Sequence, residues 1–140
     1  MTQLPTDGAG FTPSEQDVAS VLAWFADYDA LAGKVDVEGM ADKALFPINT
    51  VSTGPDGTGA AESWDRATFV QKMTEIMGGA GDVEMDSTRT PHFLSQNLVF
   101  VITDATFTVE GHKQTVRYGD LLVRSGGEWK FQTMVQGGWG

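Results

Sequence analysis

The sequence predicts an α+β domain, with helices in the first half of the chain and strands in the second. Three helix-like segments and one strand-like segment occupy residues 12–79. From residue 83 onward, four strand-like segments follow one another with only short connections between them. Helices followed by a run of hairpin-linked strands are typical of the α+β class. At 140 residues, the chain is long enough for a single domain with a substantial hydrophobic core.

The composition is that of a globular protein, with 41% hydrophobic and 20% charged residues. The absence of cysteine excludes disulfides and thiolate sites. Nineteen acidic against nine basic residues give a net charge of −10, which repels phosphate groups, so we expect no nucleic-acid partner. The N-terminus lacks the basic and apolar regions of a signal peptide, and no apolar run is as long as a membrane span. We therefore expect a cytoplasmic protein that does not bind membranes.

The first predicted helix follows a short lead. Residues 1–11 contain Gly, Thr and Pro and are expected to be loosely ordered, so the domain spans residues 12–140. The stretch TPSE predicts the helix start, with Thr12 as the N-cap and Pro13 at the first helical position. Apolar residues then recur at helical spacing, and Gly33 is the predicted stop.

A second, shorter helix is predicted from Asp36 towards Phe46, where Pro47 would end it. The sequence FPINTVST predicts a strand at 46–53, and GPDGTG predicts a turn at 54–59.

The third predicted helix begins after Asp65, a favourable N-cap. Trp64 before this cap and Phe69 inside the helix have the spacing of a hydrophobic staple. Apolar residues follow at helical spacing, and Gly78 and Gly79 are expected to end the helix.

The second half of the chain predicts an antiparallel meander. Its connections, SQN, EGHK and SGGE, are typical of hairpins. The stretch VRYGDLLVR places Asp120 inside an otherwise apolar strand, where a carboxylate is costly unless it is paired, hydrogen-bonded or neutral. The four predicted strands span residues 83–94, 97–109, 113–125 and 128–136.

The order of these elements resembles the nuclear transport factor 2-like superfamily, in its SnoaL-like, ketosteroid-isomerase-like branch. The resemblance covers nearly the whole chain and is carried by VLAWFADYDALAGKVDVEGM, ALFPINTVS, SWDRATFVQKM and YGDLLVRSGGEWKFQTMVQGGW. It implies a cystatin-like cone, in which a curved, mostly antiparallel sheet wraps around a pocket that three N-terminal helices cover. It also implies a homodimer formed through the convex face of the sheet. If Asp120 points inward, then Gly119, Leu121 and Val123 point outward and are available to such an interface.

The resemblance also implies a pair of hydrogen-bond donors. Asp120 falls where ketosteroid isomerases carry a protonated Asp of their oxyanion hole. Tyr28, eight residues before Asp36, falls at the position of the Tyr that completes it. An apolar pocket raises the pKa of an Asp, and the neutral acid can then donate. Alternatively, Asp120 is a structural residue held by a neighbouring Tyr, Trp or Arg.

The general base of the isomerases does not carry over. Its position falls near Thr53, and no carboxylate lies from residue 43 to 55. His92 is a candidate replacement, with Asp120 as its orienting partner. Alternatively, His92 is hydrogen-bonded within or at the edge of the core. With two histidines and no cysteine, we expect no metal site.

A set of apolar, amide and aromatic residues is predicted to line the pocket, where it would hold a small apolar molecule. No phosphate-loop, dinucleotide, serine-hydrolase or zincin motif is present, so we expect no cofactor. The predicted ligand-binding residues are Trp24, Phe46, Asn49, Phe69, Met73, Tyr118, Met134, Gln136 and Trp139.

Two functions are compatible with these residues. One is a cofactor-independent isomerase, cyclase or lyase that acts on an apolar carbonyl compound. The other is a non-catalytic module for ligand binding or dimeric assembly.

Overall fold

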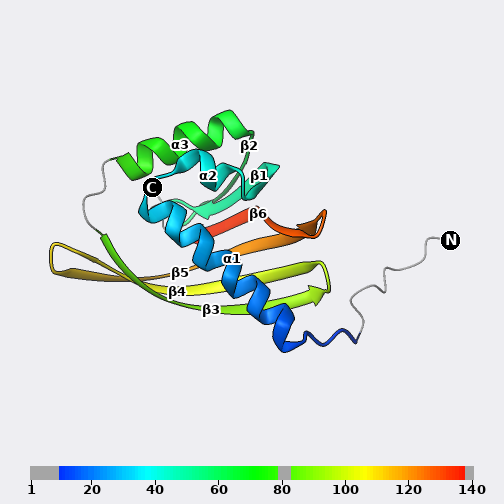
Figure 1. Ribbon diagram of the computed structural model, residues 1–140. Helices are drawn as coiled ribbons and strands as arrows, with labels where there is room; N and C mark the ends of the chain where they lie inside the picture. Colours follow the sequence, from blue (N-terminus) through cyan, green and yellow to red (C-terminus); the bar gives the residue numbers. More distant parts are fainter. Residues whose placement is uncertain (1–9, 79–82, 138–140) are drawn as a thin grey trace.

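The computed structural model describes residues 10–78 and 83–137. It confirms the α+β class, with three helices and six strands in this part of the chain (Figure 1). The helices are α1 (Glu15–Gly33), α2 (Val37–Ala41) and α3 (Arg66–Gly78). The strands are β1 (Ala44–Thr53), β2 (Gly59–Trp64), β3 (Val83–Ser95), β4 (Leu98–Val109), β5 (His112–Ser125) and β6 (Glu128–Gly137).

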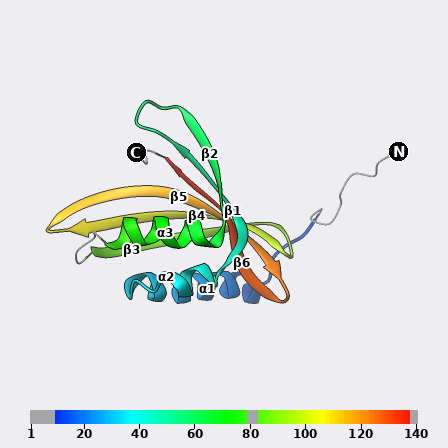
Figure 2. The same ribbon diagram turned by 90° about the horizontal axis from the view of Figure 1, so that it is seen from above.

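The strands form one curved sheet in the order β2-β1-β6-β5-β4-β3. Only β1 and β6 pair in parallel, and every other neighbouring pair is antiparallel. Figure 2 shows α1 and α2 along one side of the long strands β3, β4 and β5. All three helices bury residues in the same core cluster, which the inner face of the sheet completes. None of the described helices is long and apolar enough to cross a membrane.

Local capping explains where the helices begin. The predicted cap of α1 at Thr12 is wrong, because Ser14 caps the helix and Asp17 completes a reciprocal capping box with it. The predicted cap of α3 at Asp65 is confirmed, and Asp36, where the second helix was predicted to start, caps α2. The Asp36 carboxylate accepts a hydrogen bond from the backbone N–H of Gly39, and the Asp65 carboxylate accepts one from the N–H of Thr68.

The strand predictions need two corrections in the first half of the sheet. The α2 helix ends at Ala41, and β1 begins at Ala44, so Pro47 lies inside a strand rather than ending a helix. Strand β2 was not predicted, because its sequence GAAESW has few strand-forming residues. It is an edge strand that forms through its pairing with β1. The four later strands agree with the prediction to within one residue at each end.

The two faces of the sheet differ in what covers them. On β4, Val99, Val101 and Thr103 are fully buried and face the helices. Phe100 and Ile102 alternate with them on the outer face, where the Phe100 ring lies over Gly119 of β5. A Cβ atom at Gly119 would lie 2.4 Å from this ring, so any other residue there would force the Phe100 ring to move.

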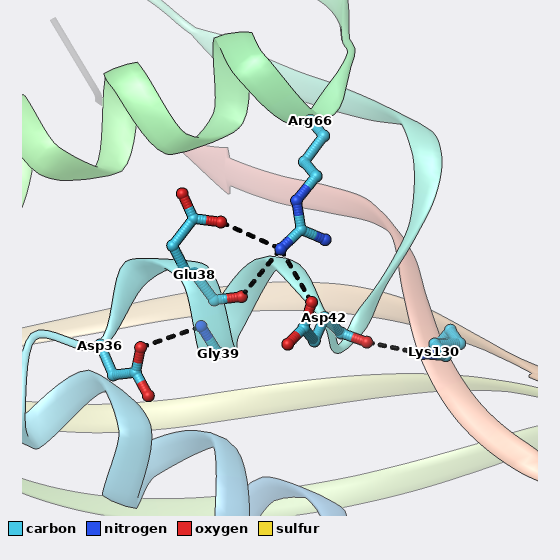
Figure 3. Close-up of polar contacts among 6 residues, drawn as sticks. All are labelled: Asp36, Glu38, Gly39, Asp42, Arg66 and Lys130. Carbon is cyan, nitrogen blue, oxygen red and sulfur yellow. Dashed lines mark hydrogen bonds and ion pairs between the residues drawn. The ribbon is translucent and has the colours of Figure 1, made fainter.

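A polar network fixes α2 between α3 and β6 (Figure 3). The Arg66 guanidinium, at the start of α3, donates to the backbone oxygen and carboxylate of Glu38 and to the Asp42 carboxylate, at 3.3, 3.0 and 2.8 Å. The Lys130 ammonium donates to the backbone oxygen of Asp42 at 2.6 Å. These contacts hold in place the short helix that contributes Met40 to the core beneath it.

Candidate functional site

Asp120 lies on the inner face of β5, where apolar residues flank it. Its Cα partners are Val101 on β4, which is fully buried, and Met134 on β6, which packs against the core. Among the described residues, the Asp120 carboxyl has no hydrogen bond or ion pair. Burial raises its pKa to about 7, although the positive charge of Arg89 acts in the opposite direction. A large share of the Asp120 side chains is therefore neutral at neutral pH and able to donate a hydrogen bond.

Tyr28 of α1 faces the same interior. Its ring is stacked on Trp24, with centroids 5.3 Å apart, and meets Phe131 of β6 edge-on at 5.5 Å. Burial, together with the negative charge of Asp120, raises the pKa of the Tyr28 phenol. The phenol therefore stays protonated and serves as a hydrogen-bond donor. No hydrogen bond joins it to Asp120 among the described contacts, so both groups are available to a third partner.

Arg89 of β3 is the residue that sequence reasoning missed. Its side chain is only 8% exposed, and two of its nitrogens bind the two oxygens of Asp29 on α1, at 2.5 and 3.1 Å. It also donates to the Thr103 hydroxyl at 3.3 Å, and its guanidinium lies 4.4 Å from the centre of the Phe25 ring. Strand alternation supplies a signal for this placement, because Arg89 shares its face with Phe93.

Arg89 also orients Tyr118, which lies two residues before Asp120 on the same face of β5. The guanidinium donates to the Tyr118 oxygen at 3.4 Å. Because this bond uses the oxygen as an acceptor, the hydroxyl hydrogen of Tyr118 remains free to donate to another group. Burial raises the pKa of this phenol, and Arg89 opposes the shift.

Most of the predicted lining residues lie in the interior between the helices and the sheet. Gln136 is the Cα partner of Tyr118 and shares its face. Trp24 and Phe69 are buried in the core cluster, and Phe46, Met73 and Met134 pack against it. Trp139 lies outside the described residues.

Asn49 does not line this interior. It is exposed on the opposite face of β1, because its neighbour Ile48 is the residue buried in the core. Its Cα partner Thr133 is next to Met134, which shares the face of Asp120.

The predicted partnership of His92 with Asp120 is also wrong. The residue of β3 that lines up with Asp120 across Val101 is Pro91, so His92 points to the outer face. There it is exposed and pairs with Phe100. It therefore cannot act on a group held inside the same chain.

Two hollows open on the surface of the described chain. One, of about 490 Å³, lies between α1 and the start of β6, and Trp24 lines it together with Ser20, Trp129 and Lys130. The other, of about 440 Å³, lies at the far ends of β3, β4 and β5. Neither is lined by Asp120 or Tyr28. No group of three potential metal ligands occurs within the described residues.

Comparison with known proteins bears on the fold alone. No protein-family model and no curated protein sequence matches the chain. Among solved structures, the chain is similar to an NTF2-like protein of unknown function from Pseudomonas putida KT2440, with a TM-score of 0.74, 12% identity, and coverage of 90% of this chain and 89% of that one. It is also similar to a ketosteroid isomerase-like protein from Erwinia carotovora atroseptica SCRI1043, with a TM-score of 0.62, 17% identity, and coverage of 89% and 97%.

A third similar structure is a Novosphingobium aromaticivorans DSM 12444 protein that has been proposed to be a scytalone dehydratase. Its TM-score is 0.63 at 16% identity, with coverage of 86% of this chain and 82% of that one. The chain therefore has the NTF2-like fold, as the order of its elements predicted. This fold is shared by proteins of several activities, so the function has to be argued from the site.

Proposed function

We propose that the chain binds a small apolar molecule with a carbonyl oxygen, and that Asp120 and Tyr28 donate hydrogen bonds to this oxygen. One observation carries the proposal: Asp120 faces the helix side of the sheet without a partner among the described residues, beside a protonated tyrosine. Asp120 is half-buried among apolar residues, and a carboxyl group placed there without a partner is costly to the fold, which is typical of a group kept for function.

The chemistry that this pair supports is a cofactor-independent isomerisation, cyclisation or elimination. Such reactions pass through an enolate, and each preorganised donor to its oxygen stabilises the transition state by about 3–4 kcal/mol in comparable sites. No carboxylate is present at the base position near Thr53, and His92 lies on the other face. In this proposal, a bound water therefore moves the proton.

A matched set of variants tests the site. Asp120→Leu and Tyr28→Phe each remove one donor and keep the shape, whereas His92→Gln changes the outer face only. We expect the affinity for 1-tetralone, measured by calorimetry, to fall at least tenfold in the first two variants and to stay unchanged in His92→Gln. Unchanged affinity in both donor variants would contradict the proposal.

A turnover assay with wild-type protein and the same variants distinguishes catalysis from binding alone. Conversion of 3-cyclohexen-1-one to its conjugated isomer is followed by the ultraviolet absorbance of the product. Turnover that falls at least tenfold in Asp120→Leu and Tyr28→Phe supports an enzyme. Binding of 1-tetralone without conversion favours the alternative, a non-catalytic ligand-binding module.

We also propose that two copies pair through the outer face of the sheet. Phe100, Ile102, Leu121 and Val135 form a half-buried apolar surface there, and none of the three helices covers it. An apolar face that a chain leaves open is typical of an interface.

A further inference from the structure

The indole of Trp24 contains an unsatisfied buried donor. The side chain is 8% exposed, and its Nε1 atom is buried without a hydrogen-bond partner in the described part of the chain. No other buried side-chain nitrogen or oxygen atom of the described residues lacks a partner. Leaving such a donor unpaired costs about 1–3 kcal/mol, so a group of this kind calls for an explanation.

The other indoles of the described chain show that this is not a general property of its tryptophans. Trp129 is buried to a similar extent, and its Nε1 donates to the Ser20 hydroxyl at 3.1 Å. The Nε1 atom of Trp64 donates to the Glu62 carboxylate at 2.8 Å. Of these three tryptophans, only Trp24 has a buried indole nitrogen without an acceptor.

The position of Trp24 connects this donor to the proposed site. Tyr28 follows four residues later on the same face of α1, and its ring stacks on the indole with an interplanar angle of 10°. Both rings meet Phe131 edge-on, at centroid distances of 6.0 and 5.5 Å. Phe131 in turn pairs with Leu122, two residues along β5 from Asp120. Trp24 therefore adjoins the residues that would hold the ligand, at the level of Leu122.

Four polar groups around this interior can donate a hydrogen bond. Asp120 in its neutral form, Tyr28 and Tyr118 each have a hydroxyl hydrogen to donate, and the indole nitrogen can only donate. Two nearby acceptors, the Asp29 carboxylate and the Thr103 hydroxyl, bind Arg89. A ligand that satisfies this set has to bring more than one acceptor.

We infer that Trp24 Nε1 is a ligand-binding group, which donates to a second oxygen of the molecule whose carbonyl oxygen Asp120 and Tyr28 bind. The inference rests on the proposed function and narrows the ligand class from apolar ketones to apolar ketones with a second acceptor oxygen. When no ligand is bound, the indole N–H has no acceptor among the described residues, so no hydrogen bond protects it from exchange with water that enters the site.

The first test needs no ligand. In protein labelled with ¹⁵N at the indole nitrogens, the Trp24 and Trp129 signals are assigned by their loss in Trp24→Phe and Trp129→Phe. We expect the Trp24 N–H to exchange with water at least tenfold faster than the Trp129 N–H, although both side chains are buried to a similar extent. Exchange as slow as that of Trp129 would overturn the inference, because the donor would then be sealed in the core.

The second test compares three probes of one shape. 1-Tetralone has a single oxygen, whereas 4-chromanone and isochroman-4-one each replace one ring CH₂ by an ether oxygen. We expect at least one of the two ethers to bind wild-type protein threefold or more tighter than 1-tetralone, and to shift the Trp24 N–H signal downfield. In Trp24→Phe, this preference should disappear, so that the ether and 1-tetralone bind the variant with affinities within twofold of each other. A preference that survives in Trp24→Phe would overturn the inference.

The inference and the proposed function can fail separately. A Trp24 signal that responds to an ether probe, together with normal 1-tetralone affinity in Asp120→Leu and Tyr28→Phe, refutes the proposed carbonyl donors and keeps the Trp24 assignment. A loss of 1-tetralone binding in those two variants, without any ether preference in wild-type protein, supports the carbonyl donors and refutes the role of Trp24.

Discussion

At the scale of single residues, the site depends on which side chains the sheet turns inward. The alternation of β5 places Asp120 and Tyr118 on the helix-facing side and Gly119 and Leu121 on the other, which follows from the period of two in any strand. The inward orientation of Asp120 could therefore be predicted from its neighbours in VRYGDLLVR. The role of Arg89 could not, because its main partner, Asp29, comes from a helix 60 residues earlier in the chain.

The raised pKa of Asp120 predicts a dependence of stability on pH. The folded protein holds this proton up to about pH 7, whereas the unfolded chain releases it near pH 4. Between these values the folded state binds more protons, so the contribution of Asp120 to stability falls as the pH rises, and it levels off above pH 7. Asp120→Asn removes the titration and keeps the shape.

Urea unfolding of both proteins at pH 4.5 and pH 8 measures this effect. From pH 4.5 to pH 8, we expect the free energy of unfolding of Asp120→Asn to rise relative to that of wild type. The expected rise is on the order of 2–4 kcal/mol, since each pKa unit corresponds to about 1.4 kcal/mol. Comparing the two proteins cancels the contributions of other titrating groups that they share. Parallel pH profiles would show that Asp120 is ionised in the folded protein throughout this range.

At the scale of elements, local signals explain the helices better than the strands of the first half. Asp36 and Asp65 were identifiable as helix starts because the capping bonds that they make span only three residues. Strand β2 has no comparable local signal, because only its pairing with β1 specifies it. The start of β1 was misplaced for the same reason, since Ala44 pairs with Phe131, far away in the sequence.

The Arg89–Asp29 ion pair joins β3 to α1, and Arg89→Gln tests its contribution. The variant keeps much of the side-chain volume and removes the charge that binds both oxygens of Asp29. We expect a loss of about 2 kcal/mol of stability, below the 3–5 kcal/mol typical of a fully buried pair, because Asp29 is 40% exposed and can be hydrated. The pKa of Asp120 should rise further, because Arg89 lowers it in wild type.

Urea unfolding and the carboxyl ¹³C signal of Asp120 measure these two effects. Arg117→Gln is the matched control, because Arg117 makes a similar pair with Asp104 on the exposed outer face. It should change stability much less and leave the Asp120 pKa in place, since exposed pairs contribute little. Equal effects of the two variants would mean that Arg89 has no special role in fixing α1 to the sheet.

At the scale of the whole molecule, the sheet has two faces with different proposed roles, and strand β5 contributes residues to both. The inner face of β5 holds the candidate site under the helices, and its outer face holds Leu121, whose Cα partners are Phe100 and Thr133. A change on the outer face can therefore be tested without touching the site. In a symmetric dimer, the same surface of each copy contacts the other copy. The single apolar outer face of the sheet therefore favours a symmetric dimer.

Leu121→Lys tests the dimer, because a lysine in the centre of the outer face would have to be buried without a partner in the interface. Light scattering after gel filtration should give wild-type protein twice the 15.0 kDa mass of one chain, and the variant the mass of one chain. The control is Leu22→Lys, the same substitution at a leucine of α1 that is 41% exposed on the helical side, and it should remain dimeric. Because Leu121 points away from the site, the monomeric variant should still bind 1-tetralone. Weak dimers have dissociation constants of roughly 50 µM. A wild-type protein that is monomeric at about this concentration would refute the dimer and leave the site proposal intact.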